Sequence, residues 1–130
     1  MSYEFFNKFL EMTNNYPSFI VLRKDGKKVL GFCFLQAYNP FPVFNKTAKI
    51  TYFLEKKEIG KGIGKIILEK LEKEAKNNGI INLLADISSE NIISIKFHIK
   101  NGFKECGRFR NIGIKKGKKF DVIWMEKTLN

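Results

Sequence analysis

The sequence predicts an α/β protein, and three observations support this. Short runs of β-branched and aromatic residues indicate strands, and apolar residues at helical spacing indicate helices. Clusters rich in glycine, proline and asparagine separate these segments. The resulting order is α-β-β-β-α-β-α-β-β, and the length of 130 residues is typical of a single domain, here residues 1–130.

The first predicted element is a short helix over residues 4–13. It rests on four apolar residues at helical spacing: Phe5, Phe6, Phe9 and Leu10. A β-hairpin is predicted next, because the apolar runs 19–23 and 29–38 flank a turn at Asp25–Gly26. After a proline-containing loop, the β-branched and aromatic residues 47–54 predict a third strand.

The second half of the sequence predicts alternating helices and strands. A helix follows a glycine cluster and ends at residues 77–79. Its apolar stripe consists of Ile63, Ile66, Ile67, Leu71 and Ala75. A short buried strand is predicted over residues 80–87, and a second helix over residues 88–100. The remainder predicts two strands joined by a loop at residues 113–119.

The composition argues against several classes of protein. The net charge of +11 would attract nucleic acid, but only Arg23, Arg108 and Arg110 of the 24 basic residues are arginines, and the lysines are spread along the chain. No apolar run approaches the roughly 18–20 residues of a membrane span. Cys33 and Cys106 make neither a disulfide framework nor a zinc site, and no signal peptide is recognisable. We therefore expect a cytoplasmic protein with no nucleic-acid, membrane or metal partner.

The most informative stretch is E-I-G-K-G-I-G-K, residues 58–65, which lies between a predicted strand and a predicted helix. The first N–H groups of a helix lack intrahelical partners, and the helix dipole makes this end partly positive. Glycines let an anion approach these N–H groups without a Cβ in the way, so the stretch is suited to bind a phosphate or pyrophosphate. Lys61 and Lys65 would attract the anion. A glycine-rich turn with no ligand is the alternative interpretation.

Known nucleotide-binding patterns fit this stretch unequally. A Walker A loop fails at Ile59 and Ile66, where it needs a glycine and a hydroxyl residue. A Rossmann fingerprint that starts at Gly60 fails at Lys65, where it needs its third glycine. The pattern x-x-G-x-G at a strand-to-helix step in mid-chain resembles the coenzyme A pyrophosphate loop of the GNAT superfamily of N-acetyltransferases.

Two further segments strengthen this resemblance. The stretch N-I-I-S-I-K-F-H-I-K-N-G-F, residues 91–103, is similar to the second GNAT signature, N-x-x-S-x-x-x-[YH]-x-x-x-G-F. The C-terminal stretch resembles the pattern G-x-x-x-x-x-G-x-K-x-G-x-x-x-D of the phosphinothricin acetyltransferase-like branch. The residues that fit it are Gly107, Gly113, Lys115, Gly117 and Asp121. The resemblance covers residues 28–129 and implies a mixed, mostly antiparallel sheet flanked by helices, without the usual first strand and helix.

The resemblance also implies acetyl-CoA as the acetyl donor and assigns a site for it. The strand that ends at Phe53–Leu54 would offer backbone groups to the pantetheine arm, and it would splay from the strand at residues 81–87. Asn91 and Ser94 would hydrogen-bond the pantetheine or adenine end. Backbone N–H groups of the glycine stretch would hold the pyrophosphate: Ile59, Gly60, Lys61, Gly62, Ile63, Gly64 and Lys65.

His98 is the residue that the resemblance implies for catalysis. It occupies the position where many relatives carry a tyrosine that protonates the departing thiolate, and this branch often has histidine there. An unperturbed histidine titrates near pH ~6.5 and can serve as acid or base near neutrality. A helix histidine that only caps or packs is the alternative. The implied reaction is direct attack of an amine on the thioester, with the oxyanion stabilised by a backbone N–H near Leu54.

Departures from the branch leave the general base and the assembly open. Lys49 stands where a glutamate is usual, and Phe53 replaces a tyrosine. A lysine side chain is protonated near pH 7 unless it is deeply buried, so Lys49 would instead bind an acidic substrate group, and the base would be water or His98. The short N-terminus leaves the strand edge at residues 19–23 exposed or paired with another subunit, as in a homodimer.

Two functions are therefore consistent with the sequence. The first is an acetyl-CoA-dependent N-acetyltransferase that acts on the primary amine of a small molecule or amino acid. The second is a catalytically impaired CoA-binding sensor or interaction module of the same fold, which Lys49 and the short N-terminus favour. The acceptor stays open among phosphinothricin-like amino acids, polyamines, aminoglycosides and protein N-termini.

Overall fold

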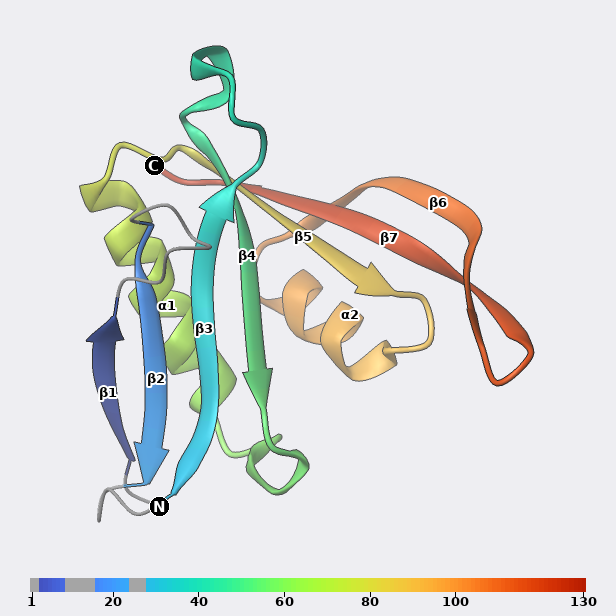
Figure 1. Cartoon of the computed structure of the whole chain (residues 1–130), viewed down its shortest axis with the longest axis horizontal. Helices are drawn as coiled ribbons and strands as arrows, with labels where there is room; N and C mark the ends of the chain where they lie inside the picture. The colour runs from blue at the N-terminus through green and yellow to red at the C-terminus, as the bar shows by residue number, and fades with distance from the viewer. Residues whose placement is uncertain (1–2, 9–15, 24–27) are drawn as a thin grey trace.

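The computed structural model describes residues 3–8, 16–23 and 28–130, which are organised around a seven-stranded sheet (Figure 1). The strand order is β1-β2-β3-β4-β5-β7-β6, and every neighbouring pair is antiparallel except β4 and β5. The strands are β1 (Tyr3–Lys8), β2 (Ser18–Arg23), β3 (Val29–Ala37), β4 (Thr47–Leu54), β5 (Asn82–Ser88), β6 (Lys104–Lys115) and β7 (Lys118–Thr128). The helices are α1 (Ile63–Asn77) and α2 (Ile92–Lys100), with 3-10 turns at Pro42–Phe44 and Lys56–Glu58.

The helix predicted over residues 4–13 is wrong over its first half. Residues Tyr3–Lys8 form β1, which pairs with β2 along its whole length, from Tyr3 opposite Arg23 to Lys8 opposite Ser18. A short aromatic run fits both helical and strand spacing. The strand is favoured here because it pairs with backbone N–H and C=O groups of β2 that would otherwise lack partners. The sequence predicted that the strand edge at residues 19–23 would be exposed or paired with another subunit. This prediction is wrong, because β1 pairs with that edge. Residues 9–13 and the predicted Asp25–Gly26 turn lie outside the described residues.

The core lies between the sheet and α1, which runs behind β2 and β3 in Figure 1. Alternate strand residues face it, as the two-residue period of a strand requires: Val21, Leu35 and Ile50 are each 3% exposed or less. The helix contributes Ile63, Ile67, Leu68, Leu71 and Ala75. Of the predicted stripe, only Ile66 is exposed, at 39%, and Leu68 takes its place in the core. Each such buried side chain contributes about 1.5–3 kcal/mol of transfer free energy.

β4 and β5 are paired only where they begin. The parallel ladder joins Thr47 to Asn82 and ends at Lys49 opposite Leu84. Beyond this point the strands diverge, and α2 lies below the opening in Figure 1. We call the gap between residues 50–54 of β4 and residues 85–88 of β5 the fork. The predicted splaying of these strands is therefore confirmed.

The C-terminal strands form a long hairpin that extends away from the rest of the sheet (Figure 1). The predicted loop over residues 113–119 is mostly strand, because β6 continues to Lys115 and β7 starts at Lys118. Only Lys116 and Gly117 form the turn, with φ of 51° and 76°. Two consecutive positive φ angles are the geometry of a tight hairpin turn, so the glycine here closes a hairpin rather than a long loop.

Candidate active site

The backbone of β4 presents unpaired polar groups to the fork. Along a strand, the backbone N–H and C=O groups of successive residues point alternately to one neighbouring strand and to the other. The N–H of Glu55 donates to the carbonyl of Leu30 in the strand β3, at 2.9 Å, so odd-numbered residues of β4 bond to β3. Beyond the end of the parallel ladder, the residues whose N–H and C=O point toward β5 are Tyr52 and Leu54. Since β5 has diverged there, an extended ligand with its own amide groups can take its place.

The glycine stretch has the backbone conformation that an anion site needs. Gly60 and Gly62 adopt φ of 85° and 83°, which side chains other than glycine rarely accept, and a Cβ at either position would meet nothing within 4 Å. Gly62 is the N-cap of α1 and makes no side-chain cap. Among the described residues, helical bonding starts at Ile66, whose N–H donates to the Gly62 carbonyl at 3.4 Å. The preceding N–H groups, from Gly60 to Lys65, thus have no helical partner, and all of them except that of the buried Ile63 belong to residues with exposed surface.

The side chains around this stretch differ in how free they are. Lys61 Nζ lies 3.4 Å from Oε1 of Glu58, a carboxylate whose residue is only 5% exposed. Lys65 and Ile59 are exposed, and Ile63 is fully buried in the core. Gly64 is packed against α2, since a Cβ there would lie 3.3 Å from the ring of Phe97. Lys65 is therefore the better placed of the two predicted lysines to attract an anion.

Asn91 and Ser94 have local roles at the start of α2. Asn91 is the N-cap, and its Oδ1 accepts the N–H of Ser94 at 3.1 Å. This is the standard way to satisfy one of the first helical N–H groups. Asn91 is exposed, whereas Ser94 is half-buried and its Oγ lies 3.3 Å from Nδ1 of His98.

His98 lies under the fork and is only 3% exposed. Its Nδ1 lies 2.7 Å from the carbonyl of Ser94, and its Nε2 lies 2.6 Å from the hydroxyl of Tyr52. A carbonyl only accepts, so Nδ1 carries the proton and Nε2 accepts from Tyr52. Burial lowers the pKa of His98, with a smaller opposing effect of the Ser94 carbonyl, so the imidazole is neutral at pH 7. Burial likewise raises the pKa of the Tyr52 hydroxyl, which stays protonated.

Lys49 is paired with an acid on the other arm of the fork. Its Nζ lies 3.0 Å from Oδ2 of Asp86 and 5.7 Å from the centre of the Trp124 ring. Neither Asp86 nor Tyr52 was predicted as a site residue. An acid inside the apolar run N-L-L-A-D-I was a signal for Asp86, whereas nothing near Tyr52 in the sequence indicates His98 as its partner.

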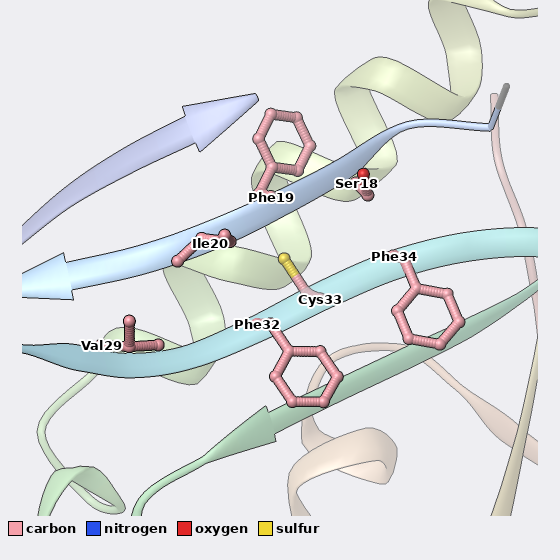
Figure 2. Close-up of a pocket in the computed structure, with 7 residues that line it drawn as sticks. All are labelled: Ser18, Phe19, Ile20, Val29, Phe32, Cys33 and Phe34. Atoms are coloured by element: carbon pink, nitrogen blue, oxygen red, sulfur yellow. The ribbon is translucent and has the colours of Figure 1, made fainter. Parts of the chain in front are cut away.

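A pocket of about 220 Å³ lies on β2 and β3 (Figure 2). Its lining is Ser18, Phe19, Ile20, Val29, Phe32, Cys33 and Phe34. It offers no charged group to a pyrophosphate, so it does not correspond to the predicted cofactor site. Burial raises the pKa of the Cys33 thiol to about 12, so this thiol is not a nucleophile near neutrality.

The fold and the fork define the class of protein. A splayed parallel strand pair beside a glycine-rich helix start is the arrangement of acetyltransferases that take their acetyl group from acetyl-CoA. The chain belongs to the GNAT acetyltransferase family, whose domain model matches residues 1–124.

Several relatives of known name share most of this chain. It is 32% identical over 118 residues to YwnH of Bacillus subtilis, provisionally named a phosphinothricin acetyltransferase, and covers 72% of that protein. It is 30% identical over 115 residues to the L-methionine sulfoximine/L-methionine sulfone acetyltransferase of Pseudomonas aeruginosa, of which it covers 66%. These alignments take up 91% and 88% of the present chain, so the chain spans about two thirds of the relatives' length.

Solved structures agree with the fold. A phosphinothricin acetyltransferase of Sinorhizobium meliloti in complex with acetyl-CoA superimposes with a TM-score of 0.83 at 27% identity, over 90% of this chain and 63% of that one. An acetyltransferase of Salmonella typhimurium with acetyl-CoA gives 0.80 at 27% identity, over 88% and 65%. The GNAT fold predicted from the sequence is confirmed.

Proposed function

We propose that this chain is an acetyl-CoA-dependent N-acetyltransferase that acts on the primary amine of a small amino acid or a related compound. The observation that supports this most directly is the open fork beside a helix start rich in free N–H groups. The names of the relatives point to amino-acid acceptors, since phosphinothricin and methionine sulfoximine are both amino acids. The function is that of one acetyltransferase-like domain, residues 1–130.

The residues present fit the donor. Acetyl-CoA supplies an activated thioester carbonyl. The N–H groups between Gly60 and Lys65 bind its pyrophosphate, and the outward backbone groups of Tyr52 together with the Leu54 carbonyl bind its pantetheine amides. Ile59 and Phe53 flank these positions, and Asn91 and Ser94 offer polar atoms at the start of α2.

Protonation of the departing sulfur depends on two residues in this proposal. Nε2 of His98 is unprotonated and accepts from the Tyr52 hydroxyl, so His98 has no proton to give there and instead orients Tyr52. Tyr52 would give its hydroxyl proton to the departing thiolate and regain a proton from solvent. His98 thus acts as the predicted catalytic residue only through Tyr52. A backbone N–H at Leu54 stabilises the oxyanion.

Binding of acetyl-CoA is tested with two matched glycine variants. Gly62 and Gly79 have φ of 83° and 78° with open space around each, so a leucine at either position meets a similar backbone strain of about 1–2 kcal/mol. Only Gly62 lies in the proposed site. Calorimetric titration should show about a tenfold loss of affinity, or about 1.4 kcal/mol, in Gly62→Leu and none in Gly79→Leu.

Turnover separates the two functions that the sequence left open. Free thiol should appear when the wild-type chain receives acetyl-CoA and a panel of amino acids that includes methionine sulfoximine. Acetyl-CoA binding with no thiol release for any amine would instead indicate a CoA-binding sensor or interaction module. Failure of acetyl-CoA to bind would contradict both functions.

The remaining expectations stay part of this proposal. We place the chain in the cytoplasm, in keeping with its free thiols Cys33 and Cys106, and assign it no nucleic-acid or membrane partner. Among the described residues, no helix has the length and apolar character to cross a bilayer. A homodimer also remains proposed, although β1 now covers the strand edge that first suggested it. Sedimentation velocity measures the assembly.

A further inference from the structure

An ion pair closes the narrow end of the fork. Lys49 is the last residue of β4 to pair with β5, opposite Leu84, and Asp86 lies two residues further along β5. If the parallel ladder had continued, Asp86 would lie opposite Thr51. Instead, the Lys49 ammonium reaches across the point of divergence to the Asp86 carboxylate, at 3.0 Å.

The pair lies on the face of the sheet opposite both helices. Strand neighbours alternate between faces, and Ala48 and Ile50 on either side of Lys49 are buried, as are Ala85 and Ile87 beside Asp86. The side chains of the pair are 24% and 32% exposed. A small molecule can therefore reach both charges, while their surroundings are partly shielded from water.

A tryptophan holds the pair in place from the other side. Trp124 of β7 is directly opposite Asp86 in the ladder, and its ring lies 5.7 Å from the Lys49 ammonium. A cation over an indole face is attracted by the ring electrons. The Lys49 ammonium that holds the Asp86 carboxylate is thus itself held by a ring from β7, at the narrow end of the fork.

We propose that Asp86 is the carboxylate that takes the proton from the acceptor's ammonium group, and that Lys49 is its positioning residue. This inference rests on the proposed function. The sequence places a lysine where the related branch has its glutamate, and the structure supplies a carboxylate from the neighbouring strand at the same point of the fork.

Each proton lost in the proposed reaction has an acceptor. The acceptor enters as R-NH3⁺ and gives one proton to the Asp86 carboxylate, which passes it to water. The nitrogen lone pair forms the C–N bond to the thioester carbonyl carbon, and the C–S bond breaks. The nitrogen loses a second proton, and the departing thiolate gains one. The products are the amide and the free thiol, with one proton released to solvent.

The arrangement also favours one class of acceptor. An amino acid carries an ammonium and a carboxylate a few bonds apart. Its carboxylate can pair with the Lys49 ammonium while its ammonium approaches Asp86, so both charges of the protein pair keep an opposite partner. A plain amine offers no replacement for the partner that Lys49 loses, so amino acids should be better substrates than amines of the same size.

Asp86→Asn tests the proposal against a matched control. The variant should lower kcat about a hundredfold, the lower range for loss of a general base, and leave the Kd for acetyl-CoA unchanged. Glu126→Gln removes an exposed carboxylate from the same face of β7 and should leave kcat within about twofold of wild type. Equal losses in both variants, or no loss in Asp86→Asn, would overturn the assignment.

Variants that keep a carboxylate at the fork distinguish catalysis from folding. The exchanged pair Lys49→Glu with Asp86→Lys retains opposite charges and returns the acid to β4, so it should recover kcat relative to Asp86→Asn. Lys49→Arg should keep most of the activity, and Lys49→Met should raise the KM for an amino acid more than for a plain amine. Melting temperatures of all variants show whether each is folded. The proposal would be contradicted if the exchanged-pair variant is folded but has the same kcat as Asp86→Asn. If the wild-type chain does not bind acetyl-CoA, the proposed function itself is contradicted instead.

Discussion

The hydroxyl of Tyr52 lies 2.6 Å from Nε2 of His98, and the two rings stack with centroids 5.6 Å apart. Since Nδ1 of His98 donates to the Ser94 carbonyl, both ring nitrogens are satisfied and one neutral tautomer is fixed. His98 thus has both features that the sequence offered as alternatives, a packed helix histidine and a residue with a hydrogen-bonded route to the fork.

Tyr52→Phe should destabilise the fold and slow turnover. The change removes the donor to a buried nitrogen and leaves it without a partner, which costs about 1–3 kcal/mol. Urea denaturation measures this loss, and steady-state thiol release measures the effect on kcat. Tyr38→Phe is the control, because Tyr38 is 48% exposed and lies outside the fork. Equal stability of the two variants would show that the Tyr52–His98 bond is not formed in solution.

The pKa of His98 in the folded protein should lie below that of an unperturbed histidine. His98 is the chain's single histidine, so its C2 proton gives an isolated NMR signal. Burial lowers its pKa in the folded state, so the folded protein should titrate below the value of about 6.5 that the urea-unfolded chain should show. A folded pKa at or above the unfolded value would contradict the buried, neutral assignment.

The lowered pKa of His98 also makes the free energy of unfolding depend on pH. A base whose folded pKa is depressed stabilises the fold fully above its unfolded pKa, and this contribution is lost as the pH falls toward the folded pKa. The free energy of unfolding should therefore decline below about pH 6.5. In His98→Gln this decline should be absent, so wild type and variant should converge in stability as the pH falls through that window.

The local parts of the fold were predictable from the sequence, and the parts decided by distant residues were not. The N-cap at Asn91 and the glycine start of α1 are signalled within a few residues. The strand β1 is decided by β2, and the turn at Lys116 and Gly117 by the pairing of β6 with β7. Glycine and lysine were taken as loop residues there, although their positive φ angles belong to a tight turn.

The same distinction holds at the candidate site. The glycine stretch is contiguous, so the sequence alone locates it at the start of α1, where Gly60 and Gly62 adopt positive φ angles. Tyr52 and His98 are 46 residues apart, and Lys49 and Asp86 meet only because β4 and β5 are neighbours. A single sequence carries no signal for such contacts, and both of the unforeseen residues, Tyr52 and Asp86, belong to them.

Gly113 and Gly107 should respond differently to alanine, although both lie in β6. A Cβ at Gly113 would lie 2.1 Å from the ring of Phe120, its cross-strand partner, whereas a Cβ at Gly107 would meet nothing within 4 Å. Gly113→Ala should therefore force the ring aside, at about 1–3 kcal/mol of unfolding free energy, and Gly107→Ala should be nearly neutral. Thermal melting compares them. Equal melting temperatures would mean that Phe120 does not cover Gly113 in solution.

Asp121 should stabilise the hairpin only while it is ionised. Its carboxylate accepts the backbone N–H of Asn111 at 2.7 Å and a guanidinium N–H of Arg108 at 3.0 Å. The bond from Asn111, followed by that from Arg108, lowers the pKa of Asp121. A depressed carboxylate pKa stabilises the fold above the unfolded pKa of about 3.9, and this stabilisation is lost as the pH falls through the folded pKa.

Asp121→Ala should therefore melt at a lower temperature than wild type at pH 7, and the difference should shrink in acid once the wild-type carboxylate is protonated. Glu105→Gln is the control, because Glu105 contacts the same Arg108 at 3.5 Å but is 53% exposed. It should change the melting temperature little at either pH, as exposed ion pairs contribute about 0–1 kcal/mol. A deficit in Asp121→Ala that is equally large in acid would show that the side chain supports the hairpin by packing, and not through its charge.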